Sequence, residues 1–479
     1  MKNYTYIFIL MFFALSISAQ NDVDVLRYSQ TMVGGTARSI GFGGAVGSLG
    51  ADFSSLNVNP AGIGLYKKSE FNITPTIYFS KLNTSLNGFD NSATKDNFNL
   101  NSYGLISVYD LKAKKGLKYI QFGIGVNRTN NFNNYYHITN ENGENSLMTD
   151  YQIQAYGNSP SDLDPFSTYL AWDNYLLDTT KVNNGTWRYT SPLTNGGVFQ
   201  ELKNTTWGSM NEMNITVGSS FSDILYLGGS IGFPFVRYFE EYEYTERDIA
   251  DTISEFDKFI LDKNLETHGS GINFKLGMIF RPTGFIRLGI SFHSPTWLNL
   301  NDDYSSQITR FWDNGKKTET ASPQGHYSYE MTTPMKLIGS ATFTLARFIM
   351  LSADAEYINY SDGRLNSHDY AFFDENAEVR DKYQAAMNIR TGAEIRLRPM
   401  SFRAGLAHYG SPFANDLNDG SFWVASAGLG YRDRIVFVDL GVSYTYKNED
   451  YYLYNQDLIN AASVEYHNVR VALTMGYKF

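Results

Sequence analysis

Acidic and basic side chains recur at alternate positions in the last third of the chain, and their chemistry allows ion pairing. The charged positions are Asp354, Glu356, Arg390, Glu394, Arg396, Arg403 and Asp439. Alternation places such charges on one face of a β-strand and the intervening apolar residues on the other. Because both signs of charge occur, we expect a packed network of ion pairs and not an open aqueous channel. Whether that network only braces the wall or also has a functional role stays open.

The residues that most often carry catalysis are not arranged for it. The seven histidines stand in no catalytic motif, and the neighbours His293 and Ser294 point to opposite faces of a strand. The chain has no cysteine and no His-x-x-x-His spacing for a metal. The stretch 415–420 resembles a calcium loop only loosely, because it lacks the terminal glutamate. We therefore expect no enzymatic activity, no cofactor and no metal.

The elements that hold the charges are predicted to be strands with one face against lipid. The final strand shows the pattern most clearly, with apolar residues at Val469, Val471, Leu473, Met475, Tyr477 and Phe479. The same alternation surrounds Asp354 and Arg403. A basic side chain on the lipid face would cost roughly 2–4 kcal/mol near the bilayer midplane. The charges must therefore point into the interior of a barrel.

Segments of this kind recur along the chain and predict an all-β fold. They lie near 69–82, 97–110, 118–131, 207–220, 224–239, 267–281, 285–299, 327–345, 347–360, 385–398, 400–410, 421–432, 434–447 and 464–479. Short connectors alternate with long polar ones, which include 132–206, 240–266, 300–326, 361–384 and 448–463. Bacterial outer-membrane barrels have an even strand number, short turns on one side and long loops on the other. We predict a closed antiparallel transmembrane β-barrel of about 14 strands, with loop 132–206 on the side opposite both termini.

Composition and the N-terminus agree with an exported membrane barrel. The chain has 35 Tyr, 33 Phe and 41 Gly, and its mean hydropathy of −0.31 suits a wall in which every second residue faces water. Residues 1–19 combine a basic start, an apolar centre and a small-residue cleavage region, which predicts a signal peptide. Without cysteine the chain cannot be a lipid-anchored lipoprotein. The net charge of −10 argues against a nucleic-acid partner.

Two of the long loops show helical periodicity. In 161–177 and 247–262 apolar residues recur every three or four positions. These residues are Leu163, Phe166, Leu170, Ile249, Ile253, Phe256 and Ile260. Two interpretations stay open: helices that merely cap the loops, or an apolar surface groove where a hydrophobic molecule first settles.

The segment before the first strand is rich in small residues. Its characteristic positions are Arg38, Gly41, Gly43, Gly44, Asp52, Asn59, Pro60, Ala61 and Gly62. Small residues let the backbone pack closely in a confined place, and no Gly-Lys-Ser/Thr follows that would make a phosphate loop. We expect residues 20–66 to plug a barrel formed by 67–479. Because a buried guanidinium needs a partner, Arg38 should pair with an acid on the wall, Asp354 or Glu356 above others.

The same positions carry a family resemblance. In order, Ala37-Arg38, Gly41, Gly43-Gly44-Ala45, Asp52 and Asn59-Pro60-Ala61-Gly62 resemble the N-terminal hatch of the FadL/TodX family of outer-membrane transporters. Segments 287–295, 353–360, 391–396 and 403–407 are similar too, so the resemblance covers essentially the whole mature chain.

The resemblance implies a place in the Gram-negative outer membrane, in contact with its lipids, and passive uptake of hydrophobic small molecules such as long-chain fatty acids. A shift of the hatch would then let the cargo leave sideways through a gap in the wall. We expect a monomer. The alternative is an accessory or shuttle component of a protein-secretion apparatus, with envelope or secretion proteins as partners. The sequence does not identify the cargo.

Overall fold

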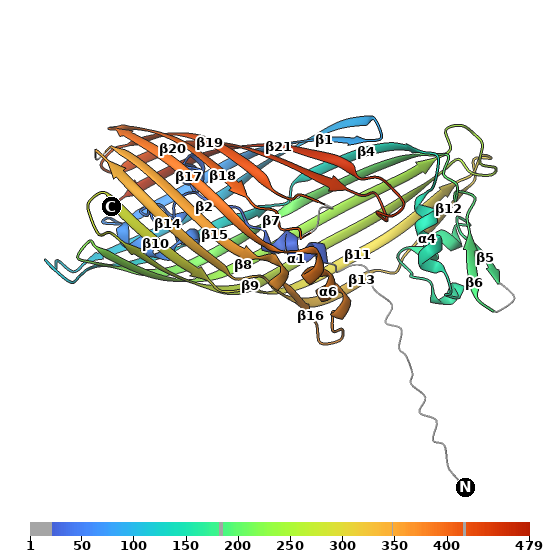
Figure 1. Ribbon diagram of the computed structural model, residues 1–479, viewed down its shortest axis with the longest axis horizontal. Helices are drawn as coiled ribbons and strands as arrows, with labels where there is room; N and C mark the ends of the chain where they lie inside the picture. The colour runs from blue at the N-terminus through green and yellow to red at the C-terminus, as the bar shows by residue number, and fades with distance from the viewer. Residues whose placement is uncertain (1–21, 182–184, 347, 415–417) are drawn as a thin grey trace, which may run out of the picture.

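The computed structural model describes residues 22–181, 185–346, 348–414 and 418–479. The predicted signal peptide and part of the stretch 415–420 therefore lie outside the described residues. The chain forms an elongated barrel of antiparallel strands (Figure 1). No helix in the described ranges is both long enough and apolar enough to cross a membrane.

Fourteen strands form the wall. They are β1 (Glu70–Leu86), β2 (Phe89–Asp110), β3 (Leu117–Asn131), β7 (Val198–Phe221), β8 (Leu225–Arg247), β9 (Lys258–Phe280), β10 (Ile286–His293), β14 (Lys336–Leu345), β15 (Ile349–Asn359), β17 (Ala385–Leu397), β18 (Met400–Tyr409), β19 (Phe422–Arg432), β20 (Val436–Tyr451) and β21 (Ala462–Lys478). The last strand pairs with the first, Tyr477 opposite Phe71, so the wall closes without a free edge. The predicted fold class and strand number are confirmed.

The two faces of the wall differ as the alternation predicts. On β20, Val436, Val438 and Leu440 are exposed on the outer face, while Phe437 and Asp439 are buried. The final strand behaves in the same way, since its exposed side chains are Leu473, Met475, Tyr477 and Phe479. An apolar outer face and a polar inner face are what lipid outside and a filled lumen inside require.

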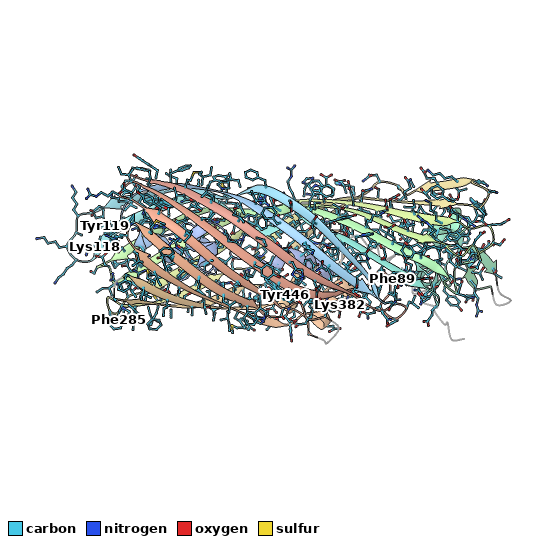
Figure 2. The ribbon with its side chains drawn as sticks, turned by 90° about the horizontal axis from the view of Figure 1, so that it is seen from above. Phe89, Lys118, Tyr119, Phe285, Lys382 and Tyr446 are labelled. Carbon is cyan, nitrogen blue, oxygen red and sulfur yellow. The ribbon has the colours of Figure 1, made fainter. Side chains whose placement is uncertain are left out.

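The short turns lie at one end of the barrel and the long connectors at the other. Lys118, Tyr119 and Phe285 stand beside the short turns 111–116 and 281–285, and Figure 2 places all three at the same end. The C-terminus lies at this end, while helix α4 (Leu147–Ala155) lies at the opposite end (Figure 1). The predicted position of loop 132–206 is therefore confirmed relative to the C-terminus.

The described N-terminal end does not follow that prediction. Helix α1 (Asp22–Ser29) packs against helix α6 (Phe373–Lys382), which belongs to the long connector between β15 and β17. The described chain thus begins in the half of the barrel that carries the long connectors, and not beside the C-terminus (Figure 1).

Three wall strands extend well past the membrane. Strands β7, β8 and β9 contain 24, 23 and 23 residues, whereas about 10 suffice to cross the hydrocarbon core. Most of the predicted loop 240–266 is therefore strand, and only 248–257 connects β8 to β9. The helix predicted over 247–262 is wrong, because β9 begins at Lys258.

Shorter elements decorate the far end and the wall. The further strands are β4 (Asn134–Asn142), β5 (Asp178–Lys181), β6 (Trp187–Thr190), β11 (Trp297–Phe311), β12 (Lys317–Ala321), β13 (Gly325–Thr332) and β16 (Arg364–Asn366). The remaining helices are α2 (Ala37–Gly41), α3 (Ser55–Val58), η1 (Pro60–Leu65), η2 (Pro160–Asp162), α5 (Thr168–Asp173) and η3 (Tyr360–Asp362). Strand β4 continues β3 past a break at residues 132–133, and β11 continues β10 past residues 294–296.

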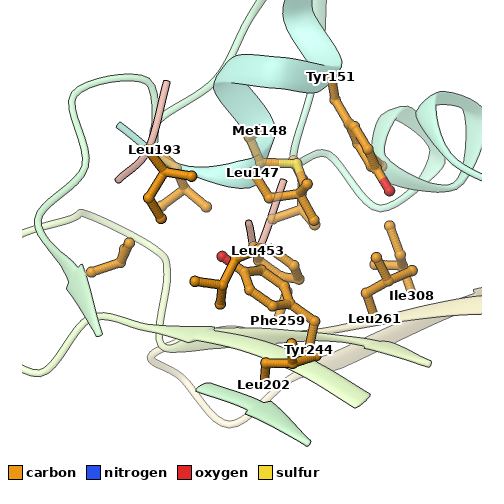
Figure 3. Packing of buried hydrophobic residues seen from close by; sticks show 14 of the residues in the cluster. Leu147, Met148, Tyr151, Leu193, Leu202, Tyr244, Phe259, Leu261, Ile308 and Leu453 are labelled. Atoms are coloured by element: carbon orange, nitrogen blue, oxygen red, sulfur yellow. The ribbon is translucent and has the colours of Figure 1, made fainter. Parts of the chain in front are cut away.

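An apolar core closes the end that carries the long loops. Helix α4 contributes Leu147 and Met148, which pack above Tyr244 and Phe259 of the extended strands (Figure 3). Burying each such side chain contributes about 1.5–3 kcal/mol. This core, and not the membrane, holds the loops in place.

Candidate functional site

Residues 36–66, the predicted hatch segment, lie inside the barrel. Helix α2 packs on the inner faces of β18 to β21, and η1 packs on β3 and β7 to β9. Nearly every residue from Thr36 to Gly64 is buried. The placement of the small-residue segment in the lumen agrees with the predicted plug.

The hatch touches the wall backbone to backbone. A Cβ at Gly228 of β8 would lie 2.3 Å from the carbonyl oxygen of Pro60, so only glycine leaves room there. Gly43, at φ +66°, lies against Gly405 of β18 in the same manner. The amide of Asn59 donates to the carbonyl oxygen of Met278 at 3.3 Å. Small residues on both sides therefore let the hatch pack closely against the wall at these points.

Arg38 holds the hatch to the wall through Glu394. Its Nε donates to the Glu394 carboxylate at 3.1 Å, and Nη1 donates to the Ala51 carbonyl oxygen at 3.1 Å. Asp52 lies 3.9 Å away within the hatch and accepts a hydrogen bond from Thr36 at 2.8 Å. The prediction that Asp354 or Glu356 would be the partner is wrong, since α2 packs on β18 to β21 and the Arg38 guanidinium reaches Glu394 on the adjoining β17.

Glu394 is the centre of a larger ion-pair network. Arg403 donates to Glu394 at 2.6 Å and to Asp439 at 2.7 Å, and both ends of each bond are buried. Arg396 also bonds Glu394 at 2.5 Å, but its side chain is partly exposed. The prediction of paired lumen charges therefore agrees with the geometry for these four residues.

The three remaining predicted charges form a second group. Glu356 pairs with the fully buried Arg390 at 3.0 Å, and Asp354 accepts a hydrogen bond from the backbone N–H of Gly47 at 2.9 Å. Asp354 thus contacts the hatch, although not through Arg38. Together the two groups clamp the hatch on the β15–β20 side of the wall.

Three cavities surround residues 22–34. An outer cavity of about 430 Å³ lies under the apolar core and has Asp24 and Arg27 of α1 in its lining. A second cavity of about 90 Å³ is lined by residues that include Tyr28 and Gly34. A third of about 180 Å³ adjoins Gln30. The N-terminal segment therefore separates an outer space from two inner ones.

Helix α1 is docked by both apolar and polar contacts. Val25 and Tyr28 are buried in a cluster with strands β11, β13 and β15, and the Arg27 guanidinium lies 4.1 Å from the centre of the Tyr238 ring. Asp22 pairs with Lys382 of α6 at 3.3 Å. Burial raises the pKa of the Asp22 carboxyl, and the Lys382 ammonium opposes that rise.

The predicted loop groove is mostly closed. Leu163, Leu170 and Phe256 are fully buried in the apolar core, while Ile249 is exposed and stands apart. Ile253 packs against the edge of that core, and Ile260 is half-buried on β9. Of the predicted groove residues, Phe166 alone lines the outer cavity, where its ring lies 4.8 Å from that of Tyr304. Capping therefore describes these loops better than an open groove.

Several inward charges were not singled out from the sequence. Lys275 pairs with Glu212 at 2.5 Å in the second cavity, and Arg128 and Arg470 line the third. The signal for Arg470 was available, because it stands between Val469 and Val471 on the final strand. Within the described ranges, no group of three or more His, Cys, Asp or Glu side chains is placed to hold a metal ion.

Comparisons with known proteins show the fold. The chain matches no protein-family model and no curated protein sequence. Among solved structures it is similar to a Pseudomonas aeruginosa FadL homologue, with 13% identity, TM-score 0.55, and coverage of 94% of this chain and 99% of that one. It is also similar to the P. putida toluene transporter TodX, with 12% identity, TM-score 0.56, and coverage of 93% and 99%. The Ralstonia pickettii toluene transporter TbuX aligns at 13% identity and TM-score 0.52, again over 93% and 99%.

Proposed function

We propose that this chain is an outer-membrane transporter of the FadL/TodX type that admits hydrophobic small molecules, such as long-chain fatty acids, into a Gram-negative cell. Residues 1–19 would be cleaved as a signal peptide, 20–66 would act as the hatch, and 67–479 would form the barrel. The fold shared with the FadL homologue and the toluene transporters supports this assignment. The observation that carries it is the row of cavities divided by the N-terminal segment.

The proposed route begins in the outer cavity. Its lining includes charged side chains, such as Asp150 and Lys263, but also apolar ones and tyrosines that can accept a hydrocarbon chain on their ring faces. Each Å² of apolar surface removed from water favours binding by about 25 cal/mol. A hydrophobic molecule would collect here before it enters the barrel.

Movement of α1 would then join the outer cavity to the inner ones. Asp24 and Arg27 face the outer cavity, while Tyr28 and the residues that follow it line the inner ones. The helix is short and is held from outside mainly by Lys382 and Tyr383. We propose that it is the gate, and that transport follows the concentration gradient.

The exit would be sideways, where the wall is least bonded. Backbone pairing between β2 and β3 ends at Ser102 and Asn127, and residues 89–99 of β2 pair with β1 alone. Beyond the Ser102–Asn127 pair, contacts between β2 and β4 are made by side chains. For example, the Asn91 amide donates to the Thr139 hydroxyl at 2.8 Å. A molecule in the third cavity lies beside this break, because Arg128 lines the cavity and directly follows Asn127.

A disulfide lock tests both the gate and the function. A Cβ at Gly363 would lie 3.8 Å from the Cβ of Val25, which is the usual spacing in a disulfide. Since the chain has no cysteine, V25C/G363C can form only this one intramolecular bond. The assay is uptake of labelled oleate by cells that lack their own transporter, with V25C and G363C alone as controls.

We expect uptake with the unmodified chain, loss of uptake when V25C/G363C is oxidised, and recovery after reduction. Equal uptake in the oxidised and reduced forms would reject α1 as the gate. No uptake by the unmodified chain, combined with copurification of secretion proteins, would reject the transport proposal in favour of a role in protein secretion.

A further inference from the structure

The end of the barrel that carries the short turns is basic, although the whole chain has a net charge of −10. Towards the opposite end, residues 240–257 include eight acidic side chains and a single basic one. The turn 111–116 instead carries Lys112, Lys114 and Lys115, and Lys118 stands beside it at the short-turn end (Figure 2). The fold therefore separates the two signs of charge along the barrel.

The lumen has a basic mouth at the short-turn end. A cavity of about 730 Å³ lies there, and we call it the basic mouth. Of the described residues in its lining, nine are basic and two are acidic, Glu70 and Asp433. Leu49, Gly50 and Ala51 of the hatch belong to the same lining. The hatch therefore forms part of the floor of the mouth.

The acids near the mouth do not balance its cations. Five of the nine basic side chains pair with a carboxylate, for example Lys478 with Glu70 at 3.5 Å. The other four form no ion pair with a described Asp or Glu, and they are Lys68, Arg287, Arg398 and Arg434. Arg432 also keeps a buried Nε without a hydrogen-bond partner. Several like charges in one concave space focus a positive field that attracts anions.

The strands direct these cations towards the lumen and not towards the surrounding lipid. On β17, Arg396 lies between Ile395 and Leu397, which are both exposed on the outer face. On β10, the half-buried Arg287 precedes the exposed Leu288, and its guanidinium donates to the carbonyl oxygen of Leu49 in the hatch at 2.8 Å. Lipid headgroups surround the outside of the wall. An occupant of the mouth would instead enter from the periplasm, which the short turns of such barrels face.

The four cations without an acidic partner come from separate parts of the chain. Lys68 precedes β1, Arg287 is on β10, Arg398 follows β17 and Arg434 precedes β20. A small anion would contact few of them at once. An extended peptide advances by roughly 3.3–3.6 Å per residue, so carboxylates along one chain can contact several of them. The arrangement therefore fits an acidic peptide better than a single small anion.

We propose that the basic mouth docks an acidic segment of a periplasmic protein. Such a segment would contact the hatch as well as the wall, because both line the mouth. The inference goes beyond the proposed function, since it depends on which end of the barrel faces the periplasm and not on what the barrel transports.

The test measures binding of fluorescein-labelled decaglutamate by fluorescence anisotropy. The purified full-length barrel is held in phosphatidylcholine nanodiscs at about 0.15 M salt, where charges more than about 8 Å apart are largely screened. The variants are K68Q/R398Q/R434Q and the charge-conserving K68R/R398K/R434K. The matched control is K112Q/K114Q/K115Q, which removes three cations from the same end but outside the lining of the mouth. Heat-modifiable gel mobility verifies that each variant is folded.

We expect decaglutamate to bind at least tenfold more tightly than an uncharged Gly-Ser peptide of equal length. K68Q/R398Q/R434Q should weaken this binding at least tenfold, whereas K112Q/K114Q/K115Q should weaken it less than threefold. K68R/R398K/R434K should keep most of the affinity. If K68Q/R398Q/R434Q is not folded, the single variants K68Q, R398Q and R434Q should each weaken binding.

Four results would overturn the inference. Decaglutamate that does not bind, or binding that both glutamine variants weaken equally, would show that the mouth is not a docking site. Displacement of decaglutamate by inorganic phosphate at an equal concentration of charge would make it a site for small anions. Loss of binding in phosphatidylglycerol nanodiscs would assign the cations to lipid headgroups. None of these results would change the uptake of oleate, so the transport proposal is tested separately.

Discussion

Two regions of the lumen treat buried charge in opposite ways. On the β15–β20 side, arginines and carboxylates alternate around the hatch, and Arg38, Arg390 and Arg403 are all paired. On the β1–β3 side and β21, Arg128 and Arg470 face a cavity without a carboxylate partner. Complete pairing suits a region that must stay closed, whereas Arg128 keeps a buried Nε without a partner.

The two regions also differ in how closely they pack against the N-terminal segment. The paired region meets the hatch through close backbone contacts, such as Gly43 on Gly405. The cavity beside Arg128 and Arg470 is bordered by Gln30 and Met32 of the N-terminal segment and leaves about 180 Å³ empty. Packing and charge therefore both distinguish these two regions of the lumen.

The largest loss of stability should follow from breaking the ion pairs on the β15–β20 side. E394Q would remove the charge that Arg38 and Arg403 share, and loss of one partner of a buried pair typically costs about 3–5 kcal/mol. Urea unfolding of the barrel in detergent measures this change. The matched control is E241Q, on the exposed face of β8, which should stay within about 0.5 kcal/mol of the unmodified chain. Equal midpoints for the two variants would show that the network does not brace the hatch.

A smaller loss of stability should follow from adding one methyl group where β8 contacts the hatch. G228A would place a Cβ 2.3 Å from the Pro60 oxygen, and overpacking of this kind costs about 1–3 kcal/mol. G229A is the control on the neighbouring residue, where the nearest atom would be a Leu276 methyl group at 3.5 Å. We expect lower stability and faster proteolysis of residues 36–66 in G228A alone. If G229A were equally affected, the close contact would not be what seats the hatch.

The smallest effect on stability is expected on the unpaired side. R128Q/R470Q removes two cations that have no carboxylate partner, so its unfolding free energy should change by less than about 1 kcal/mol. The same urea titration measures it. A loss as large as that of E394Q would mean that these arginines are structural, and the contrast between the two regions would disappear.

Period-two alternation predicts most of the wall, because lipid on one side and the lumen on the other leave each strand position little choice. Val436 to Leu440 show this directly, since every second residue is apolar and exposed. The strand ends past the membrane were harder to predict. In 247–262, Phe256 and Ile260 fit a helical period, but Phe259 and Leu261 fit a strand, and pairing with β8 and β11 decided for the strand.

The partner of Arg38 could not be chosen from the sequence. Asp354, Glu356 and Glu394 all point inward, and alternation fixes the face of a residue but not its position around the barrel. The position of α2 under β18 to β21 selects Glu394. The cavity at Arg128 was hidden for a related reason, because no local pattern marks the end of the β2–β3 ladder at Asn127 or the irregularity in the β3–β7 pairing between Arg128 and Asn130.

The most direct test of an interior path is to locate a ligand in it. Crystals of the protein grown with a long-chain fatty acid that carries bromine at its chain end would place that end by anomalous scattering. We predict a bromine signal inside the barrel wall or in the β2–β3 break. Bromine signals only on the lipid-facing surface, with the three cavities empty, would contradict the account.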